Sequence, residues 1–150
     1  MRLQEELTQF GFQKKGIIKT DEEQTLPKLE LLEPDDDLEG SVYLWVTEID
    51  NTPSQIIYVG KAGGKMSKRI KEWNRGFTSH VTAIPISFEL LKYLEAGTKI
   101  SIYVRHSDMI KILGQEHISL CETEEKVLIR LYKGVQPLLN KLDNSLRKKI

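Results

Sequence analysis

The chain has 150 residues, a size that suits one globular domain, and its 22 basic and 22 acidic residues balance to a formal net charge of zero. The balanced charge argues against a protein that coats nucleic acid through bulk positive charge, and no apolar run approaches the roughly 20 residues of a bilayer-spanning helix. A single cysteine, Cys121, excludes an internal disulfide and a cysteine-ligated zinc site, so we expect a soluble cytoplasmic protein, without a membrane partner, that is stabilised by a packed core.

The charges are nevertheless unevenly distributed along the chain. Residues 21–50 contain eleven acidic residues and one basic residue, whereas residues 61–80 contain six basic residues and one acidic one. A second basic segment covers residues 126–149. Both basic segments suit contact with phosphates, although solvated helix faces explain either one equally well. We expect the acidic segment to face away from a bound nucleic acid or to shield the site.

The first 40 residues are predicted to be an extension that packs on the main domain. Apolar residues at helical spacing predict a short helix over residues 2–10. Residues 17–18 and 29–31 are candidate strand fragments, and the acidic run at 34–37 indicates a turn. This turn separates the extension from a main domain that covers residues 41–150.

The main domain opens with two predicted strands. Residues 41–47 alternate in a two-residue period that is rich in β-branched and aromatic side chains, which is typical of a strand. Turn residues at 50–54 separate this segment from a second strand at 55–59. The pair is predicted to form an antiparallel hairpin that brings Tyr43 and Tyr58 near each other.

Three helices and a third strand follow the hairpin. Apolar spacing predicts a helix over 66–77, a helix capped by Ser87, a strand over 99–105 and a last helix over 119–132. The fold class is therefore α/β (α+β), with a small central antiparallel sheet of three main strands flanked by helices.

The last helix places a carboxylate on its apolar stripe. Glu125 completes the helical spacing of a stripe that otherwise runs through apolar residues from Cys121 to Tyr132. An ionised carboxylate that faces a sheet is costly unless a cation meets it. A metal ion would satisfy Glu125, and so would a salt bridge to Lys61 or Arg69.

Several common catalytic motifs are absent. Val59 and Met66 occupy the positions where a nucleotide phosphate loop needs a glycine and a Ser or Thr. The sequence lacks the glycine fingerprint of a dinucleotide site and the serine elbow of a hydrolase. Its three histidines are too scattered to form a metal-ligand pair on one helix.

The remaining polar residues form an ordered set: two strand tyrosines, a glycine after the second tyrosine, an arginine on the next helix and a glutamate on a later one. This set resembles the GIY-YIG nuclease family. The matching segments are Ser41-Val42-Tyr43, Tyr58-Val59-Gly60, Arg69 eleven residues after Tyr58, Glu125 on its helix, and the closing Pro137 and Asn140. The chain departs from the family pattern where Ser41-Val42 replaces Gly-Ile and where Trp73 stands at a position that several members fill with histidine. His80 is a candidate substitute for that histidine.

The resemblance implies a divalent-metal-dependent DNA endonuclease that leaves a 5′-phosphate. Phosphodiester hydrolysis needs a base for the attacking water, a cation near the phosphate oxygens and help for the leaving oxygen. We expect Glu125 to hold Mg²⁺ or Mn²⁺ and Arg69 to bind the phosphate. Tyr43 or Tyr58 would accept or relay a proton, and the metal and Lys61 would assist by lowering the pKa of the phenol or by delivering a hydroxide. Asn140 would position a loop or a water.

The expected partner is DNA, with a homodimer where both strands are cut. The candidate DNA-binding residues are the basic side chains that follow the second tyrosine: Lys61, Lys65, Lys68, Lys71, Arg75 and His80. The alternative is a catalytically inactive module with a nuclease-like fold that binds nucleic acid or a protein partner. A small-molecule phosphodiesterase or a deoxyribonucleotide-processing enzyme fits less well, because the basic segments exceed what a small substrate needs.

Overall fold

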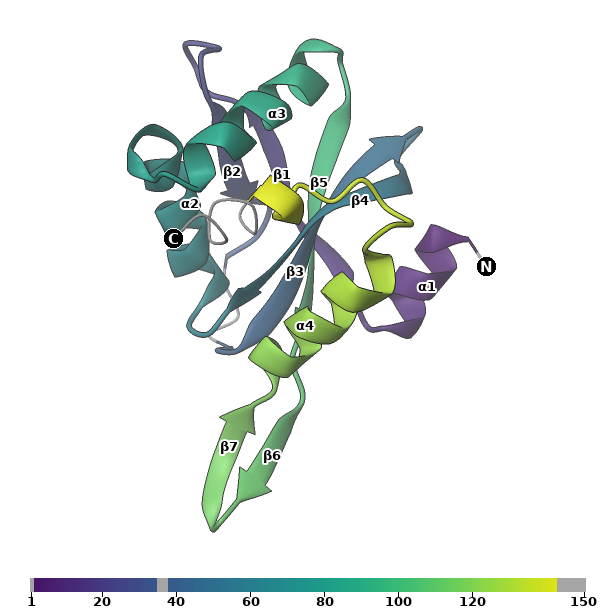
Figure 1. The fold of residues 1–150 in the computed structure, drawn as a ribbon, viewed down its shortest axis with the longest axis vertical. Coiled ribbons are helices and arrows are strands. Elements are labelled where there is room, and N and C mark those ends of the chain that lie inside the picture. The colour runs from purple at the N-terminus through teal and green to yellow at the C-terminus, as the bar shows by residue number, and fades with distance from the viewer. Residues whose placement is uncertain (1, 35–37, 143–150) are drawn as a thin grey trace.

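A computed structural model describes residues 2–34 and 38–142 of the chain. An antiparallel five-stranded sheet, in the order β2-β1-β5-β3-β4, forms its centre, with helices on both faces (Figure 1). The sheet strands are β1 (Gln13–Thr20), β2 (Pro27–Leu31), β3 (Ser41–Ile49), β4 (Thr52–Ala62) and β5 (Lys99–His106). The helices are α1 (Leu3–Gln9), α2 (Met66–Ser79), α3 (Ala83–Glu95) and α4 (Cys121–Tyr132).

The sequence correctly predicts an α+β fold with an antiparallel sheet, but the expectation of three strands is wrong. The two additional strands, β1 and β2, come from the first 40 residues and contain the candidate strand fragments 17–18 and 29–31. β1 pairs with β5 and with β2, so the sheet continues across the predicted boundary near residue 40. The sequence pattern is weak here because β1 buries little of its length and carries lysines on its exposed positions.

The central strand β3 is buried on both faces of the sheet. Its residues from Ser41 to Glu48 are all buried, as expected for a strand covered by helices on each side. Tyr43 and Trp45 face a core formed with α2 and α3. The alternating residues Val42 and Leu44 face a second core formed with α1 and α4.

The predicted helix cap at Ser87 is wrong. α3 begins at Ala83, four residues earlier, and Ser87 is buried within it. The Ser87 hydroxyl donates a hydrogen bond to the carbonyl oxygen of Ile84 at 2.6 Å. Serine side chains satisfy themselves in this way inside helices as well as at caps, so the residue type alone does not locate the start of a helix.

Each outer strand of the sheet, β2 and β4, forms backbone hydrogen bonds with an asparagine side chain. Asn74 of α2 accepts a hydrogen bond from the backbone N–H of Leu29 in β2 and donates one to its carbonyl, at 2.8 and 3.0 Å. Asn140 makes the same pair with Val59 in β4, at 2.9 and 2.7 Å. These contacts satisfy backbone groups that an open edge leaves unpaired.

A buried carboxylate, Glu48, lies at the opposite end of β3 from Tyr43. Its oxygens accept hydrogen bonds from Lys14 at 3.0 Å, from Tyr103 at 3.2 Å and from the hydroxyl of Ser101. Burial opposes ionisation of Glu48, yet these donors hold its pKa below the ordinary value of 4.5. Burial and the neighbouring Glu48 carboxylate raise the pKa of Tyr103 to about 12.

We expect Glu48→Gln to destabilise the protein in a pH-dependent way. A lowered pKa in the folded state contributes stability above the ordinary value of 4.5, and this contribution disappears as the pH falls through the folded-state pKa. At neutral pH the variant should lose about 1.5–3 kcal/mol of unfolding free energy, since a charged acceptor is removed. Urea unfolding across a pH series measures the difference, which should shrink below about pH 4.5. A difference that stays constant with pH contradicts this role.

A second, two-stranded sheet was missed by the sequence prediction. β6 (Met109–Ile112) and β7 (Gln115–Ser119) form a hairpin between β5 and α4 that projects away from the rest of the fold (Figure 1). Every residue of β6 is exposed, so its apolar side chains do not follow the burial pattern of a core strand. Within the described part of the chain, each helix is too short or too polar to cross a membrane.

Candidate active site

The candidate site is built on the pairing of β3 with β4. Tyr43 lies opposite Gly60, and any Cβ atom added at Gly60 would overlap the phenol ring of Tyr43. The ring therefore crosses directly over the backbone of β4, which only glycine permits. Gly60, in the segment Tyr58-Val59-Gly60, is thus required by the ring of Tyr43.

The hydroxyl of Tyr43 connects two residues of α2. Its oxygen accepts hydrogen bonds from Nε1 of Trp73 at 2.6 Å and from Nε of Arg69 at 3.2 Å. The guanidinium carbon of Arg69 also lies 5.1 Å from the centroid of the Trp73 ring, a cation–π distance. Trp73 thus fixes both Tyr43 and Arg69, a role that sequence analysis missed because its apolar spacing indicated only core packing.

Tyr58 is held by the same aromatic cluster. Its ring stacks on Trp45 with centroids 4.5 Å apart and meets the edge of Trp73 at 5.2 Å. The rings of Tyr43 and Tyr58 are 6.3 Å apart. Offset and edge contacts of this kind restrict ring orientation, so both phenols are positioned in advance of any ligand.

The charges of the site are coupled to one another. Burial raises the pKa of Tyr43, the positive charge of Arg69 lowers it, and the carboxylate of Glu125 raises it further. For Arg69, the desolvation that lowers the pKa is outweighed mainly by Tyr43 and Tyr58, so the net shift is upward. The structure therefore brings together four of the predicted catalytic residues: Tyr43, Tyr58, Arg69 and Glu125.

The three glutamates at the start of α4 have different surroundings. Glu122 lies on the outer side, within 3.6 Å of Lys61 and 3.8 Å of Lys126. Glu124 accepts a hydrogen bond from Arg105 at 2.7 Å and from the backbone N–H of Asp108 at 3.0 Å, so it braces the root of the projecting hairpin. Glu125 is half-buried and is the carboxylate that acts on Tyr43.

Lys61 lies at the edge of this group. It follows Gly60 directly, and its side chain faces the α4 side of the sheet because successive residues of a strand alternate. Its side chain is 40% exposed, and its ammonium group is paired with Glu122. Lys61 is therefore close to the glutamate helix but on the opposite face of β4 from the two tyrosines.

The side-chain amide of Asn140 hydrogen-bonds to the backbone of β4. Both polar atoms of its side chain bond to Val59, which lies between Tyr58 and Gly60. The neighbouring Gln136 accepts a hydrogen bond from Ile56, and Leu139 donates one to Ile57. Asn140 thus fixes the strand that carries the second motif, which is a positioning role.

We expect Asn140→Ala and Asn74→Ala to destabilise the fold by similar amounts, about 1–3 kcal/mol, because each leaves one backbone N–H and one C=O without its partner. Asn74 serves as the matched control, since it closes the other edge of the sheet. Chemical unfolding measures the stability, and DNA nicking measures activity at a temperature where both variants are folded. Asn140→Ala should lose more activity than Asn74→Ala, whereas equal losses would limit Asn140 to stability.

Three of the predicted DNA-binding residues lie on α2. Lys68, Lys71 and Arg75 are exposed at spacings of three and four residues, so they share one face of the helix. In residues 2–34 and 38–142, no carboxylate forms an ion pair with these three side chains. Lys65 precedes the helix, and His80 is exposed at its other end, roughly 16 Å along the axis from Arg69. That separation places His80 away from the tyrosine cluster.

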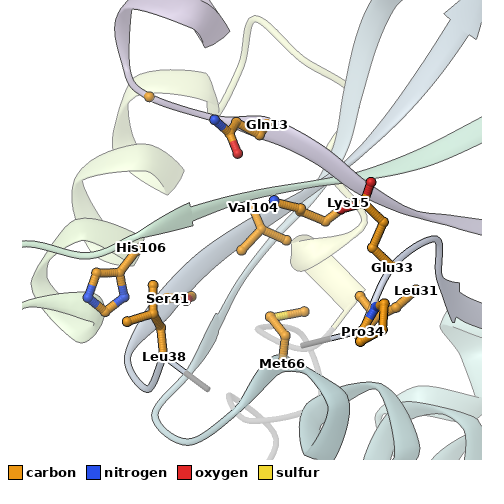
Figure 2. Close-up of a pocket in the computed structure, with 11 residues that line it drawn as sticks. Gln13, Lys15, Leu31, Glu33, Pro34, Leu38, Ser41, Met66, Val104 and His106 are labelled. Atoms are coloured by element: carbon orange, nitrogen blue, oxygen red, sulfur yellow. The ribbon is translucent and has the colours of Figure 1, made fainter. Parts of the chain in front are cut away.

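A hollow of about 370 Å³ lies beside this site, next to the start of α2 (Figure 2). Met66 points into it, while Lys15 and His106 come from neighbouring strands. The predicted catalytic residues do not line it. Parts of two predicted charged segments, residues 35–37 and 143–149, lie outside the described residues.

The described residues contain no group of three His, Cys, Asp or Glu side chains that could enclose a metal ion. Mg²⁺ does not need such a group, because it commonly keeps several waters and binds one or two carboxylates together with substrate phosphates. A half-buried carboxylate that is electrostatically coupled to Tyr43 fits that mode of binding. Glu125 is therefore the residue of this site that suits a hard divalent ion.

Comparison with known proteins identifies the fold. No family model matches the chain, and no curated protein matches its sequence. Among solved structures, a point mutant of bacteriophage T4 EndoII, a GIY-YIG-type endonuclease, matches 91% of this chain and 98% of its own length, with a TM-score of 0.67 and 19% identity. A restriction endonuclease in complex with product DNA matches 88% of this chain and 79% of its own length, with a TM-score of 0.49 and 16% identity.

The likeness to EndoII shows that the two chains share a fold. The family resemblance that the sequence motifs indicated is thereby confirmed at the level of the fold. The chemistry of the site is a separate question, because one fold can carry several activities.

Proposed function

We propose that the protein is a divalent-metal-dependent DNA endonuclease of the GIY-YIG type. The observation that carries the proposal is the convergence of Tyr43, Tyr58, Arg69 and Glu125, from four elements, into one electrostatically coupled group. Each of these residue types is common in structural roles, and their convergence on the fold of a nuclease superfamily supports a catalytic one.

Arg69 is suited to bind the scissile phosphate. Its Nε donates to Tyr43 and its ring contact is with Trp73, while its side chain remains 33% exposed. The buried part of the side chain is thus fixed. The terminal nitrogen Nη1 lies 4.0 Å from a carboxylate oxygen of Glu72, a part-exposed ion pair that a phosphate oxygen would replace. A planar, permanently charged fork held in this way opposes the negative charge that develops in the transition state.

The two tyrosines have different roles in this proposal. Burial keeps the pKa of Tyr43 above its ordinary value, so Tyr43 stays protonated at neutral pH and acts through the residues that it holds. Tyr58, whose phenol also interacts with Arg69, is the candidate for contact with the attacking water. Lys61 lies on the α4 side of β4, beside the glutamate helix, so it would supply positive charge near Glu125 and the metal rather than contact the tyrosines.

Glu125 would anchor one Mg²⁺ or Mn²⁺ ion, with waters and substrate oxygens completing the coordination. Such an ion neutralises phosphate charge and lowers the pKa of a bound water. The contribution of the chain is a half-buried carboxylate whose charge acts on Tyr43.

DNA is the proposed substrate because a row of basic side chains leads away from the site. Lys68, Lys71 and Arg75 share the exposed face of the helix that carries Arg69. Such a row suits a polyanion that continues beyond the cleaved bond, which a small phosphodiester does not. One such site cuts one strand at a time, so a double-strand break would require two protomers.

A plasmid-nicking assay tests the proposal. Supercoiled DNA should be converted to the open circle in Mg²⁺ or Mn²⁺, and EDTA should stop the reaction. DNA binding without any cleavage in either metal would instead indicate an inactive module with a nuclease-like fold. Tyr58→Phe provides the matched variant, since it keeps the ring contacts with Trp45 and Trp73 and removes only the hydroxyl.

A further inference from the structure

Two adjacent glycines, Gly63 and Gly64, lie in the loop that joins β4 to α2, and neither is required by the conformation or packing of the chain. Neither has a φ in the left-handed region, and a Cβ atom added at either position would meet no atom within 4 Å. Each of the other eight glycines has a left-handed φ or would place an added Cβ within 3.4 Å of a neighbour. Because glycine costs conformational entropy on folding, a pair without an internal role indicates a requirement outside the chain.

The loop lies close to the tyrosines of the candidate active site. Gly60, under the ring of Tyr43, is three residues before Gly63, a span of at most about 10 Å of extended chain. The carbonyl oxygen of Gly64 accepts a hydrogen bond from the N–H of Gly40 at 3.5 Å. This bond ties the loop to the segment before β3, and Figure 1 shows the loop beside the start of that strand.

The loop offers hydrogen-bond donors and positive charge. Gly63 is exposed and Gly64 is half-buried, and in the part of the chain that the structure describes their backbone N–H groups bond to no protein acceptor. Residues 61–68 contain three lysines and no acidic residue. Lysines and backbone N–H groups are donors that proteins commonly direct to the phosphates of DNA, so the chemistry of the loop suits a phosphate.

The absence of side chains at the glycine pair is what allows such a contact to be close. A phosphate reaches backbone N–H groups directly where no Cβ stands in its way, which is a common reason for glycine beside a ligand. One strand of duplex DNA carries a phosphate every 3.4 Å along the helix axis, so a span of about 10 Å corresponds to about three nucleotides. The loop also continues directly into α2, whose exposed face carries the basic row of Lys68, Lys71 and Arg75.

We propose that the backbone of Gly63 and Gly64 binds a phosphate of the DNA strand within about three nucleotides of the cleaved bond, and that both residues are glycine so that this phosphate can approach. The inference rests on the proposed DNA substrate, but it concerns binding and does not depend on cleavage. A backbone contact of this kind reads no sequence. It sets the register of the strand relative to Arg69 and Glu125.

The first test uses the double variant Gly63→Ala/Gly64→Ala. Its melting temperature should rise by a few degrees, because alanine fits both conformations and restricts the unfolded chain. Its Kd for a labelled duplex, measured by fluorescence anisotropy in EDTA at fixed salt, should nevertheless increase at least about 10-fold, a loss of about 1.4 kcal/mol of binding free energy. The control Ala96→Val adds methyl groups at the exposed end of α3 and should leave the Kd unchanged.

A second test locates the contact. Duplexes in which one phosphate at a time is replaced by a neutral methylphosphonate are scanned around the mapped nick. At one position within about three nucleotides of the nick, the replacement should weaken binding of the unchanged protein. It should have little further effect on the double variant, because both changes remove the same contact.

The outcomes separate this inference from the proposed function. Nicking with an unchanged Kd in the double variant would overturn the glycine contact and leave the endonuclease proposal standing. A lower melting temperature would show that the fold itself needs the glycines, and additive losses at every methylphosphonate position would place the contact elsewhere; either result also overturns the inference. A protein that binds DNA with the expected glycine dependence but never nicks it would refute the endonuclease proposal alone.

Discussion

Replacing Glu125 with glutamine is expected to lower the rate of metal-dependent nicking at least about 1000-fold, which corresponds to about 4 kcal/mol of transition-state stabilisation. Glutamine keeps the size and helix preference of glutamate but removes the charge that would hold the divalent ion. The fold should survive, because Glu125 is not one of the buried core residues. The initial nicking rate in Mg²⁺, measured with saturating enzyme, gives the comparison.

A control variant and a second readout accompany the Glu125→Gln measurement. Glu89→Gln changes a half-buried glutamate of α3 that forms an ion pair with Lys92, and it should leave nicking unchanged. The Glu125 variant should also lower the pKa of Tyr43, because a negative charge that opposes the phenolate is removed. NMR titration of labelled tyrosines reads this shift without any metal or substrate. Full nicking activity in Glu125→Gln would rule out the proposed role.

The second large effect is expected at Arg69, where even lysine should fail to replace arginine. Arg69→Lys keeps the charge but loses the Nε donor to Tyr43 and the forked geometry toward phosphate. We expect nicking to fall about 100-fold in Arg69→Lys and further in Arg69→Ala, at the scale measured when a preorganised donor is removed from an oxyanion site. Initial rates and melting temperatures should be measured together.

Arg2→Lys is the matched control for this substitution, since Arg2 is exposed beside the start of α1 and makes no contact with the tyrosine cluster. Its nicking rate should equal that of the unchanged protein. If Arg69→Lys also retained the full rate, a simple point charge would suffice, and the argument from the fixed guanidinium would be wrong.

The β3–β4 hairpin, which carries Tyr43 and Tyr58, was predictable because the sequence signals for it are local. Strand periodicity, turn residues and the spacing from Tyr58 to Arg69 all lie within one continuous segment of the chain. The helix of Glu125 was predictable for the same reason, since the carboxylate interrupts an apolar stripe of regular spacing.

The partners of these residues were less accessible to sequence reasoning, because they are distant in the chain. Trp73 follows an ordinary apolar stripe, and only the fold shows that its Nε1 reaches Tyr43, 30 residues earlier. Asn140 reads as a turn residue, yet its amide bonds to Val59, 81 residues away. A side chain identifies its own chemistry in sequence, but its hydrogen-bond partner is a property of the tertiary fold.

The full extent of β1 and β2, predicted only as the fragments 17–18 and 29–31, and the projecting β6–β7 hairpin were missed for a different reason. Sequence patterns report burial, and β1 buries one narrow face while β6 buries none. The turn of the projecting β6–β7 hairpin also lacks the usual Asn-Gly signal, because Leu113 occupies the first of its two left-handed positions. Apolar residues that stay exposed therefore resemble irregular chain when the sequence alone is considered.

The most direct test of the central claim is a crystal structure with Mn²⁺ and cleaved DNA, in which anomalous scattering locates the ion. The account predicts one ion at about 2.1 Å from a carboxylate oxygen of Glu125, with a phosphate oxygen shared between that ion and Arg69 and with the Tyr58 hydroxyl at the same phosphate. An ion bound elsewhere, with DNA that avoids the tyrosine cluster, would contradict it.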